Sequence, residues 1–163
     1  MPGGRESQKI KHRYNRIAGI YDSIDSPMEH MFAGHRKDML KEAHGKVLEV
    51  GAGTGKNFEH YPDDAEVTAI DFSPKMVKIA KKKAAGLSNI VQVLEMDVES
   101  MSFDDNTFDA VVTSCVFCSV PHPVTGLKEI RRVCKSGAKS IRMLKYSCCF
   151  SQIKLLILLR VNL

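Results

Sequence analysis

Short runs of apolar and β-branched residues alternate along the chain with longer amphipathic segments. Five runs have the length of a strand and are bounded by polar or glycine-containing stretches: residues 46–50, 66–70, 89–95, 108–114 and 138–144. One of the segments between them repeats apolar residues at helical spacing: Val124, Leu127, Ile130 and Val133. Strands that alternate with helices pack as a parallel sheet covered on both faces. The pattern therefore predicts an α/β, doubly wound fold.

Local signals indicate where several helices begin and end. Ser73 places a capping hydroxyl directly before Pro74, a residue that suits the first helical position. Near the N-terminus we expect helices over part of residues 7–21 and from about 28 to 43, with a break at the intervening Ser-Pro pair. The residues between the glycine cluster at 51–55 and Tyr61 are also compatible with a helix. These segments would supply the layers that cover the sheet.

Length and composition are those of an ordinary globular domain. The chain has 163 residues, 44% of them hydrophobic and 26% charged, which excludes disorder, collagen-like repeats or coiled coil as descriptions of the whole chain. The N-terminus is polar through Arg16 and has no apolar signal-peptide core. The longest apolar run, residues 155–159, is far shorter than the roughly 20 residues of a membrane span. We expect a soluble, cytoplasmic protein.

Charge is distributed unevenly along the chain. Residues 1–16 carry five basic side chains and one acidic, residues 17–127 carry ten basic and seventeen acidic, and residues 128–163 carry nine basic and one acidic. An acidic middle is not the continuous basic surface of a nucleic-acid-binding protein, so no nucleic acid partner is expected. The basic ends suit peripheral contact with anionic lipid. The lysines within 78–83 are interpreted as the solvated face of a helix.

The five cysteines have no regular spacing. Cys115 and Cys118 form a Cys-x-x-Cys pair of the kind that a zinc site or a redox centre uses, but the sequence has no second pair and no matching histidines. We therefore favour reduced cysteines that pack as small hydrophobic residues, and we predict no metal site.

A turn with three alternate glycines, residues 51–55, follows the first strand. A Walker A loop would need glycine in place of Val50 and a hydroxyl residue in place of Asn57. The dinucleotide fingerprint would need glycine in place of Lys56. The residues therefore fit neither a nucleoside triphosphate loop nor a site for NAD or FAD.

The segment Glu49-Val-Gly-Ala-Gly-Thr-Gly55 resembles motif I of the class I methyltransferases that use S-adenosylmethionine (SAM). Further features agree in order and spacing: Asp71 after the second strand, Asp97 after the third, and the segments 108–115 and 127–133, which are similar to the family's fourth strand and the helix behind it. The resemblance covers about residues 14–145. It implies a Rossmann-like sheet with SAM as the cofactor.

The resemblance also implies roles for individual residues. Glu49 would orient the amino group of the cofactor, Asp71 would accept its ribose hydroxyls, and Asp97 with Val98 would hold the adenine edge. Met76 would pack on the adenine face. The other cofactor-binding candidates are Tyr21, which would close over the methionyl group, Gly51, Ala52, Gly53, Gly55, Phe72, Ser114 and Cys115.

Plain packing roles stay open for some of these residues. Met76 equally suits a helix core, and Tyr21 equally suits helix packing. Ser114 and Cys115 lie at the carboxyl end of the fourth strand, where open α/β sheets place their ligands. His122, which lies between two prolines, is the candidate general base if the acceptor must lose a proton, although a solvated loop histidine is its alternative.

Residues 14–22 resemble the N-terminal segment of quinone C-methyltransferases and bacterial phosphatidylethanolamine N-methyltransferases, where it folds over the cofactor. The resemblance implies methyl transfer to a small-molecule or lipid-like acceptor, with a quinol or a phospholipid head group favoured. We expect a helical cap segment at 1–45, a SAM-binding domain at 46–145 and a divergent tail at 146–163. The family sheet has seven strands, and the tail is too short to supply the last two. The alternative is therefore a truncated, catalytically weak module that binds SAM or another protein.

Overall fold

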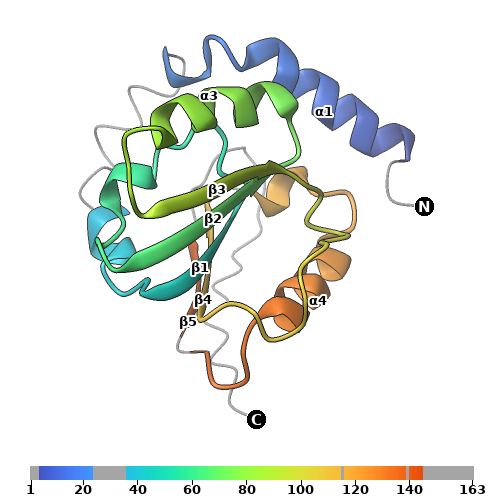
Figure 1. Ribbon diagram of the computed structural model, residues 1–163. Helices are drawn as coiled ribbons and strands as arrows, with labels where there is room; N and C mark the ends of the chain where they lie inside the picture. Colours follow the sequence, from blue (N-terminus) through green and yellow to red (C-terminus); the bar gives the residue numbers. More distant parts are fainter. Residues whose placement is uncertain (1–3, 24–35, 115, 139, 145–163) are drawn as a thin grey trace.

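A computed structural model describes residues 4–23, 36–114, 116–138 and 140–144, the last of these as backbone. They form one sheet of five parallel strands in the order β3-β2-β1-β4-β5 (Figure 1). The strands are β1 (Gly45–Val50), β2 (Ala65–Asp71), β3 (Ile90–Glu95), β4 (Ala110–Ser114) and β5 (Ser140–Leu144). The order changes direction at β1, which is where such sheets bind ligands. The α/β fold expected from the alternation is confirmed.

Helices cover both faces of this sheet. They are α1 (Arg5–Ile17), α3 (Pro74–Ala84) and α4 (Pro123–Val133), with residues 36–40 also helical and with the short 3₁₀ helices η1 (Phe58–His60) and η2 (Phe117–Ser119). Val47 faces the layer of α3 and residues 36–40, whereas its neighbour Leu48 faces α4. In the central strands β1, β2 and β4, alternate residues are thus buried on opposite faces, which explains why these strands appear in the sequence as continuous apolar runs.

The helix start expected at Ser73 is present. The Ser73 hydroxyl accepts a hydrogen bond from the Met76 amide at 3.3 Å, and Pro74 is the first residue of α3. Met76, Val77 and Ala80 form the buried face of this helix. The cap therefore fixes the start of α3 immediately behind the end of β2.

Two expectations about helices are corrected. The stretch that leads to Tyr61 is not an α-helix: the glycines continue into turns and then the single 3₁₀ turn η1, because the side chain of Asn57 is held in buried hydrogen bonds. The helix expected to reach residue 43 ends at 40, and its expected start lies outside the described residues. The divergent tail, 146–163, also lies outside them. Among the described residues no helix is long and apolar enough to cross a membrane.

Candidate functional site

The glycine turn after β1 requires the backbone freedom of glycine. Gly51 has φ +70° and Gly55 has φ +79°, a region that L side chains rarely adopt. A Cβ at Gly51 would also lie 2.3 Å from Cγ2 of Val116, and one at Gly55 would lie 2.6 Å from the ring of Phe58. The Gly51 amide donates to the carbonyl of Ile70 at 2.8 Å, which joins the turn to β2.

Asp71 ends β2 beside this turn. Its Oδ2 accepts the Gly53 amide and its Oδ1 accepts the Ser73 amide, both at 2.8 Å. Burial raises the pKa of Asp71, while these two amides oppose the rise. A carboxylate has about four acceptor positions, so two amides leave capacity for further donors. Asp71 therefore both fixes the turn and keeps acceptors available in the cleft beside it.

A cleft opens at the carboxyl ends of the strands and is covered by α1. The lining includes residues from the ends of β1, β2 and β4, from the segment after β3, and from α1, whose Ile10, Lys11 and Tyr14 form part of its wall. Nine of the residues singled out in the sequence line it together: Tyr21, Gly51, Gly53, Asp71, Phe72, Met76, Asp97, Val98 and Ser114. Glu49, Ala52, Gly55 and His122 do not line it, and Cys115 lies outside the described residues.

Glu49 lies behind the cleft in a buried polar network. Its Oε1 accepts from Asn57 Nδ2 at 2.7 Å and its Oε2 accepts from the Tyr61 hydroxyl at 3.1 Å. Asn57 is bonded in turn to Arg36, whose Nη1 donates to Oδ1 at 2.6 Å, and to Ser114 Oγ at 3.2 Å. Burial raises the pKa of Glu49 to about 7, although the two hydrogen bonds and the charge of Arg36 oppose the rise. The carboxyl can therefore gain or lose a proton near neutral pH.

The N-terminal segment is bonded to the site at three points. Tyr14 shares a 2.7 Å hydrogen bond with Ser119, and Asn15 Oδ1 accepts from the Ser73 hydroxyl at 2.8 Å. Asp22 accepts from the Thr54 hydroxyl at 2.5 Å and from Lys83 Nζ at 2.9 Å. These contacts hold α1 and the residues after it across the open end of the sheet.

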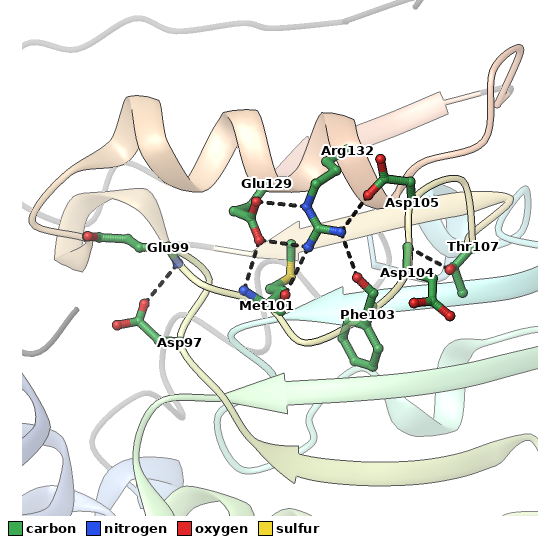
Figure 2. Close-up of polar contacts among 9 residues, drawn as sticks. All are labelled: Asp97, Glu99, Met101, Phe103, Asp104, Asp105, Thr107, Glu129 and Arg132. Atoms are coloured by element: carbon green, nitrogen blue, oxygen red, sulfur yellow. Dashed lines mark hydrogen bonds and ion pairs between the residues drawn. The ribbon is translucent and has the colours of Figure 1, made fainter. Parts of the chain in front are cut away.

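The connection from β3 to β4 is bonded to α4 by one arginine (Figure 2). Arg132 Nη1 and Nη2 donate to the carbonyls of Phe103 and Met101 at 2.6 and 2.9 Å, and its guanidinium also pairs with Glu129 and Asp105. Glu129 accepts the Met101 amide at 2.9 Å. We call these contacts of Arg132 and Glu129 the arginine clamp. The clamp begins at Met101, four residues after Asp97 of the cleft, and fixes the path of the chain there.

His122 lies at the start of α4, outside the cleft lining. Its Nδ1 is 2.8 Å from Oε2 of Glu99, and its amide donates to Oε1 of the same carboxylate at 2.8 Å. The imidazole is exposed, whereas the Glu99 carboxylate is buried. Glu99 thus orients the ring.

The cysteines behave differently from one another. Cys134 is buried, and burial raises the pKa of its thiol to about 11, as expected for a packed, unreactive cysteine. Cys118 is exposed, so the expectation of packing is wrong for it. Within the described part of the chain no group of metal-ligating side chains comes together.

Several residues that build the site were not singled out from the sequence. Arg36, Asn57, Asp22, Glu99 and Arg132 each act through a partner that is distant in the chain. Only Asn57 carried a local signal, a polar residue two positions after the glycine turn. The other four are charged residues of a kind that is usually solvated.

Comparison with known proteins identifies the family to which the chain belongs. The family described as methyltransferase domain matches residues 48–141. The phosphatidylethanolamine N-methyltransferase of Cereibacter sphaeroides is 38% identical over 142 residues, which are 83% of this chain and 68% of that protein. The demethylmenaquinone methyltransferase of Staphylococcus epidermidis is 33% identical over 135 residues, which are 80% of this chain and 54% of that protein.

The fold also has counterparts among solved structures. Phosphoethanolamine N-methyltransferase 1 of Haemonchus contortus, solved with phosphoethanolamine and S-adenosylhomocysteine, superimposes with a TM-score of 0.70. The match covers 88% of this chain and 33% of that one at 19% identity, and at that identity it establishes the fold alone. The chain spans between about one-third and two-thirds of the length of these three proteins.

Proposed function

Because this chain belongs to the family of methyltransferase domains that use SAM, we propose that it transfers a methyl group from SAM to a small-molecule or lipid-like acceptor. The relatives are named for a phospholipid head group and for a menaquinone precursor. A phospholipid head group and a quinol are accordingly the two acceptor classes favoured. The observation that carries the proposal is the cleft at the change of strand order, where the glycine turn and Asp71 meet.

The described residues fit this cofactor. Asp71 retains acceptor positions in the cleft after it has bonded two amides, which suits a pair of vicinal hydroxyls. Gly53 lines the cleft, and no atom lies within 4 Å of a Cβ built on it, so the backbone there leaves room for a ligand to approach. Met76 and Val98 add apolar surface to the lining, as a flat base would require.

We assign the remaining roles on the same basis. Asp97 would accept the adenine amine, with Phe72 and Val98 beside the ring. Glu49 would act on the cofactor's amino group from behind the turn, directly or through water, and Tyr21 would cover the methionyl group. The turn residues Gly51, Ala52 and Gly55 would shape the backbone for that group, and Ser114 and Cys115 would lie at the boundary with the acceptor.

When bound, SAM supplies a methyl group already activated by its sulfonium centre. The contribution left to this chain is to bring the acceptor into line and to exclude water, effects worth several orders of magnitude in rate. Helix α1 and Tyr21 would exclude water by covering the cleft. For an acceptor that must lose a proton, the base would be His122, whose Nδ1 bonds to Glu99 and whose Nε2 would take the proton.

The first test is calorimetric titration of the purified chain with SAM and S-adenosylhomocysteine. Asp71→Ala should raise the Kd for both by on the order of 100-fold, because the ribose loses its charged acceptor. Asp64→Ala is the matched control, since Asp64 precedes the other end of β2 and is exposed. If folded wild-type chain does not bind either compound, or if Asp71→Ala binds like Asp64→Ala, the proposed site is wrong.

Methyl transfer itself is tested separately with a radiolabelled methyl donor. A demethylated quinol and phosphatidylethanolamine vesicles are the two acceptors to compare. A chain that binds the cofactor but labels neither acceptor would instead be a cofactor-binding module.

A further inference from the structure

The two helices beside the cleft carry a concentration of positive charge that is not evident from either one alone. Helix α1 has five lysines and arginines with Glu6 as its one acidic residue, and α3 has five lysines and no acidic residue. The two helices contain ten of the chain's 24 Lys and Arg residues. In the sequence the two helices are separated by more than fifty residues of net acidic character. The distribution of charge along the chain therefore does not show that the lysines and arginines of α1 and α3 lie close together.

The fold brings these helices together. Asn15 of α1 accepts the Ser73 hydroxyl and the Lys75 amide at the start of α3, at 2.8 and 3.2 Å. Figure 1 shows α1 and α3 next to one another on the same side of the sheet, with α4 on the opposite side. Six exposed side chains define what we call the basic face: Lys9, Arg13 and Arg16 of α1, and Lys78, Lys81 and Lys82 of α3.

The charges of the basic face have no acidic partner within the part of the chain that the structure describes. Among the residues that the structure describes, none of the six forms an ion pair, whereas the nearby Lys11 and Lys83 pair with Glu95 and Asp22. Unpaired cations gathered on one surface create a positive potential that extends about a Debye length, roughly 8–10 Å, into solution. Such a surface is suited to a polyanionic partner.

We propose that the basic face binds the anionic surface of a lipid bilayer. Three features favour a bilayer over other polyanions. Helix α1 presents its inner side, with Ile10 and Tyr14, to the cleft, so a surface that binds its outer side is separated from the cleft by the thickness of one helix. Ile20, just after α1, is 56% exposed and can enter the interfacial region of the bilayer. The choice of lipid over nucleic acid rests on the proposed function, because a lipid-like acceptor is reached from a membrane.

Co-sedimentation with vesicles tests this proposal. Vesicles of phosphatidylcholine alone are compared with vesicles that contain about one-third phosphatidylserine, at low and at physiological salt. We expect the full chain to sediment with the anionic vesicles only, and to do so less as salt increases. Failure of the wild-type chain to bind anionic vesicles at low salt would overturn the proposal.

Three pairs of substitutions, each of which removes two positive charges, locate the surface. Lys9→Gln with Arg16→Gln on α1, and Lys78→Gln with Lys82→Gln on α3, should each lower the partition coefficient by about 10- to 30-fold. Lys128→Gln with Arg131→Gln on α4 is the matched control on the opposite side and should change it less than about twofold. A loss in the control pair equal to that in the other two would overturn the proposal, since the net charge of the chain would then account for binding.

Two further measurements distinguish a bilayer from a nucleic acid, and vesicle binding from cofactor binding. A wild-type chain that prefers single-stranded RNA to anionic vesicles at equal phosphate concentration would overturn the proposal in favour of nucleic acid. Titration of each variant with S-adenosylhomocysteine in solution reports on the cleft independently, and unchanged affinity in the vesicle-defective variants is the expected result. A chain that binds vesicles through the basic face but does not bind this compound would refute the proposed function and leave the docking surface standing.

Discussion

Glu49 carries an ionisable carboxyl into the interior of the sheet, where its side chain is almost completely enclosed. Asn57 and Tyr61 donate to its two oxygens, and Arg36 lies behind Asn57. These partners do not compensate fully for burial, because the pKa of Glu49 is still raised to about 7 from 4.5. An acid kept at this position at a cost in stability suggests a requirement for its charge, which the proposed contact with the cofactor's amino group would provide.

Glu49→Gln should therefore stabilise the protein in a pH-dependent way. The unfolded chain releases the Glu49 proton near pH 4.5 and the folded chain only near pH 7, so the wild-type protein loses stability as pH rises through this window. The variant avoids that loss, and its advantage should grow from almost nothing below about pH 4.5 to on the order of 3 kcal/mol above about pH 7.

Denaturant unfolding of both proteins at about pH 5 and about pH 8 measures this advantage. The same variant should bind S-adenosylhomocysteine more weakly at pH 8, since the charge is absent. An advantage that is equal at both pH values would show that Glu49 is not the titrating group.

The connection between β3 and β4 shows how one helix fixes a loop that carries site residues. Arg132 of α4 satisfies two backbone carbonyls in this connection and pairs with two carboxylates (Figure 2). Hydrogen bonds from a charged, planar group to fixed carbonyls are stronger and more directional than neutral ones. Asp97 and Val98, which line the cleft, lie at the start of the same connection.

Removal of this clamp should destabilise the fold by a moderate amount. Arg132→Ala leaves the carbonyls of Met101 and Phe103 without their donors, at an expected cost of about 1 to 2 kcal/mol in the free energy of unfolding. Arg131→Ala is the control, since that side chain is exposed and should cost less than about 0.5 kcal/mol. Chemical denaturation measures both losses. If the free energy of unfolding fell equally in Arg132→Ala and Arg131→Ala, the contacts of the Arg132 guanidinium would contribute nothing to stability.

Across the whole molecule, the N-terminal segment acts as a cover that is attached to the sheet by polar contacts. Asp22 is its contact with the glycine turn, through Thr54, and with α3, through Lys83. Burial works against ionisation of Asp22, but these two hydrogen bonds together with the positive charges of Lys83 and Lys56 outweigh it and hold the pKa of Asp22 below its usual value. We expect a ligand to enter and leave the cleft by movement of this cover, so the strength of the Asp22 contact should set the rate of exchange.

Asp22→Asn should therefore loosen the cover without unfolding the domain. We expect the dissociation rate of S-adenosylhomocysteine to rise by about 10-fold in stopped-flow measurements, with little change in unfolding free energy. Asp38→Asn is the matched control, because Asp38 is an exposed acid that pairs with the exposed Lys41 and lies away from the glycine turn. A dissociation rate for Asp22→Asn that equals the rate of the control would mean that the contact does not limit exchange.

The strands could be predicted to within two residues. For β1, β2 and β4 the reason is that a strand buried on both faces is a continuous apolar run in the sequence. The residues that line the cleft could be identified as far as they belong to a local motif, as Gly53 and Asp71 do. The networks around Glu49 and Arg132 could not, because each joins segments that are distant in the chain. The turns after the glycines were missed for the same reason, since the buried partners of Asn57 override its local preference.

The strand order has a consequence for folding of the chain during its synthesis on the ribosome. Strands β1 to β3 come from residues 45–95 and can pair as soon as they are synthesised, while β4, the other neighbour of β1, is synthesised later. Until then one edge of β1 is unpaired, and the apolar face that contains Leu48 and Ile70 is exposed because α4, which packs on it, has not yet been synthesised. A nascent chain at this stage exposes apolar side chains and an unpaired strand edge of the incomplete sheet. Slow translation between β3 and α4 would prolong that exposure and promote aggregation.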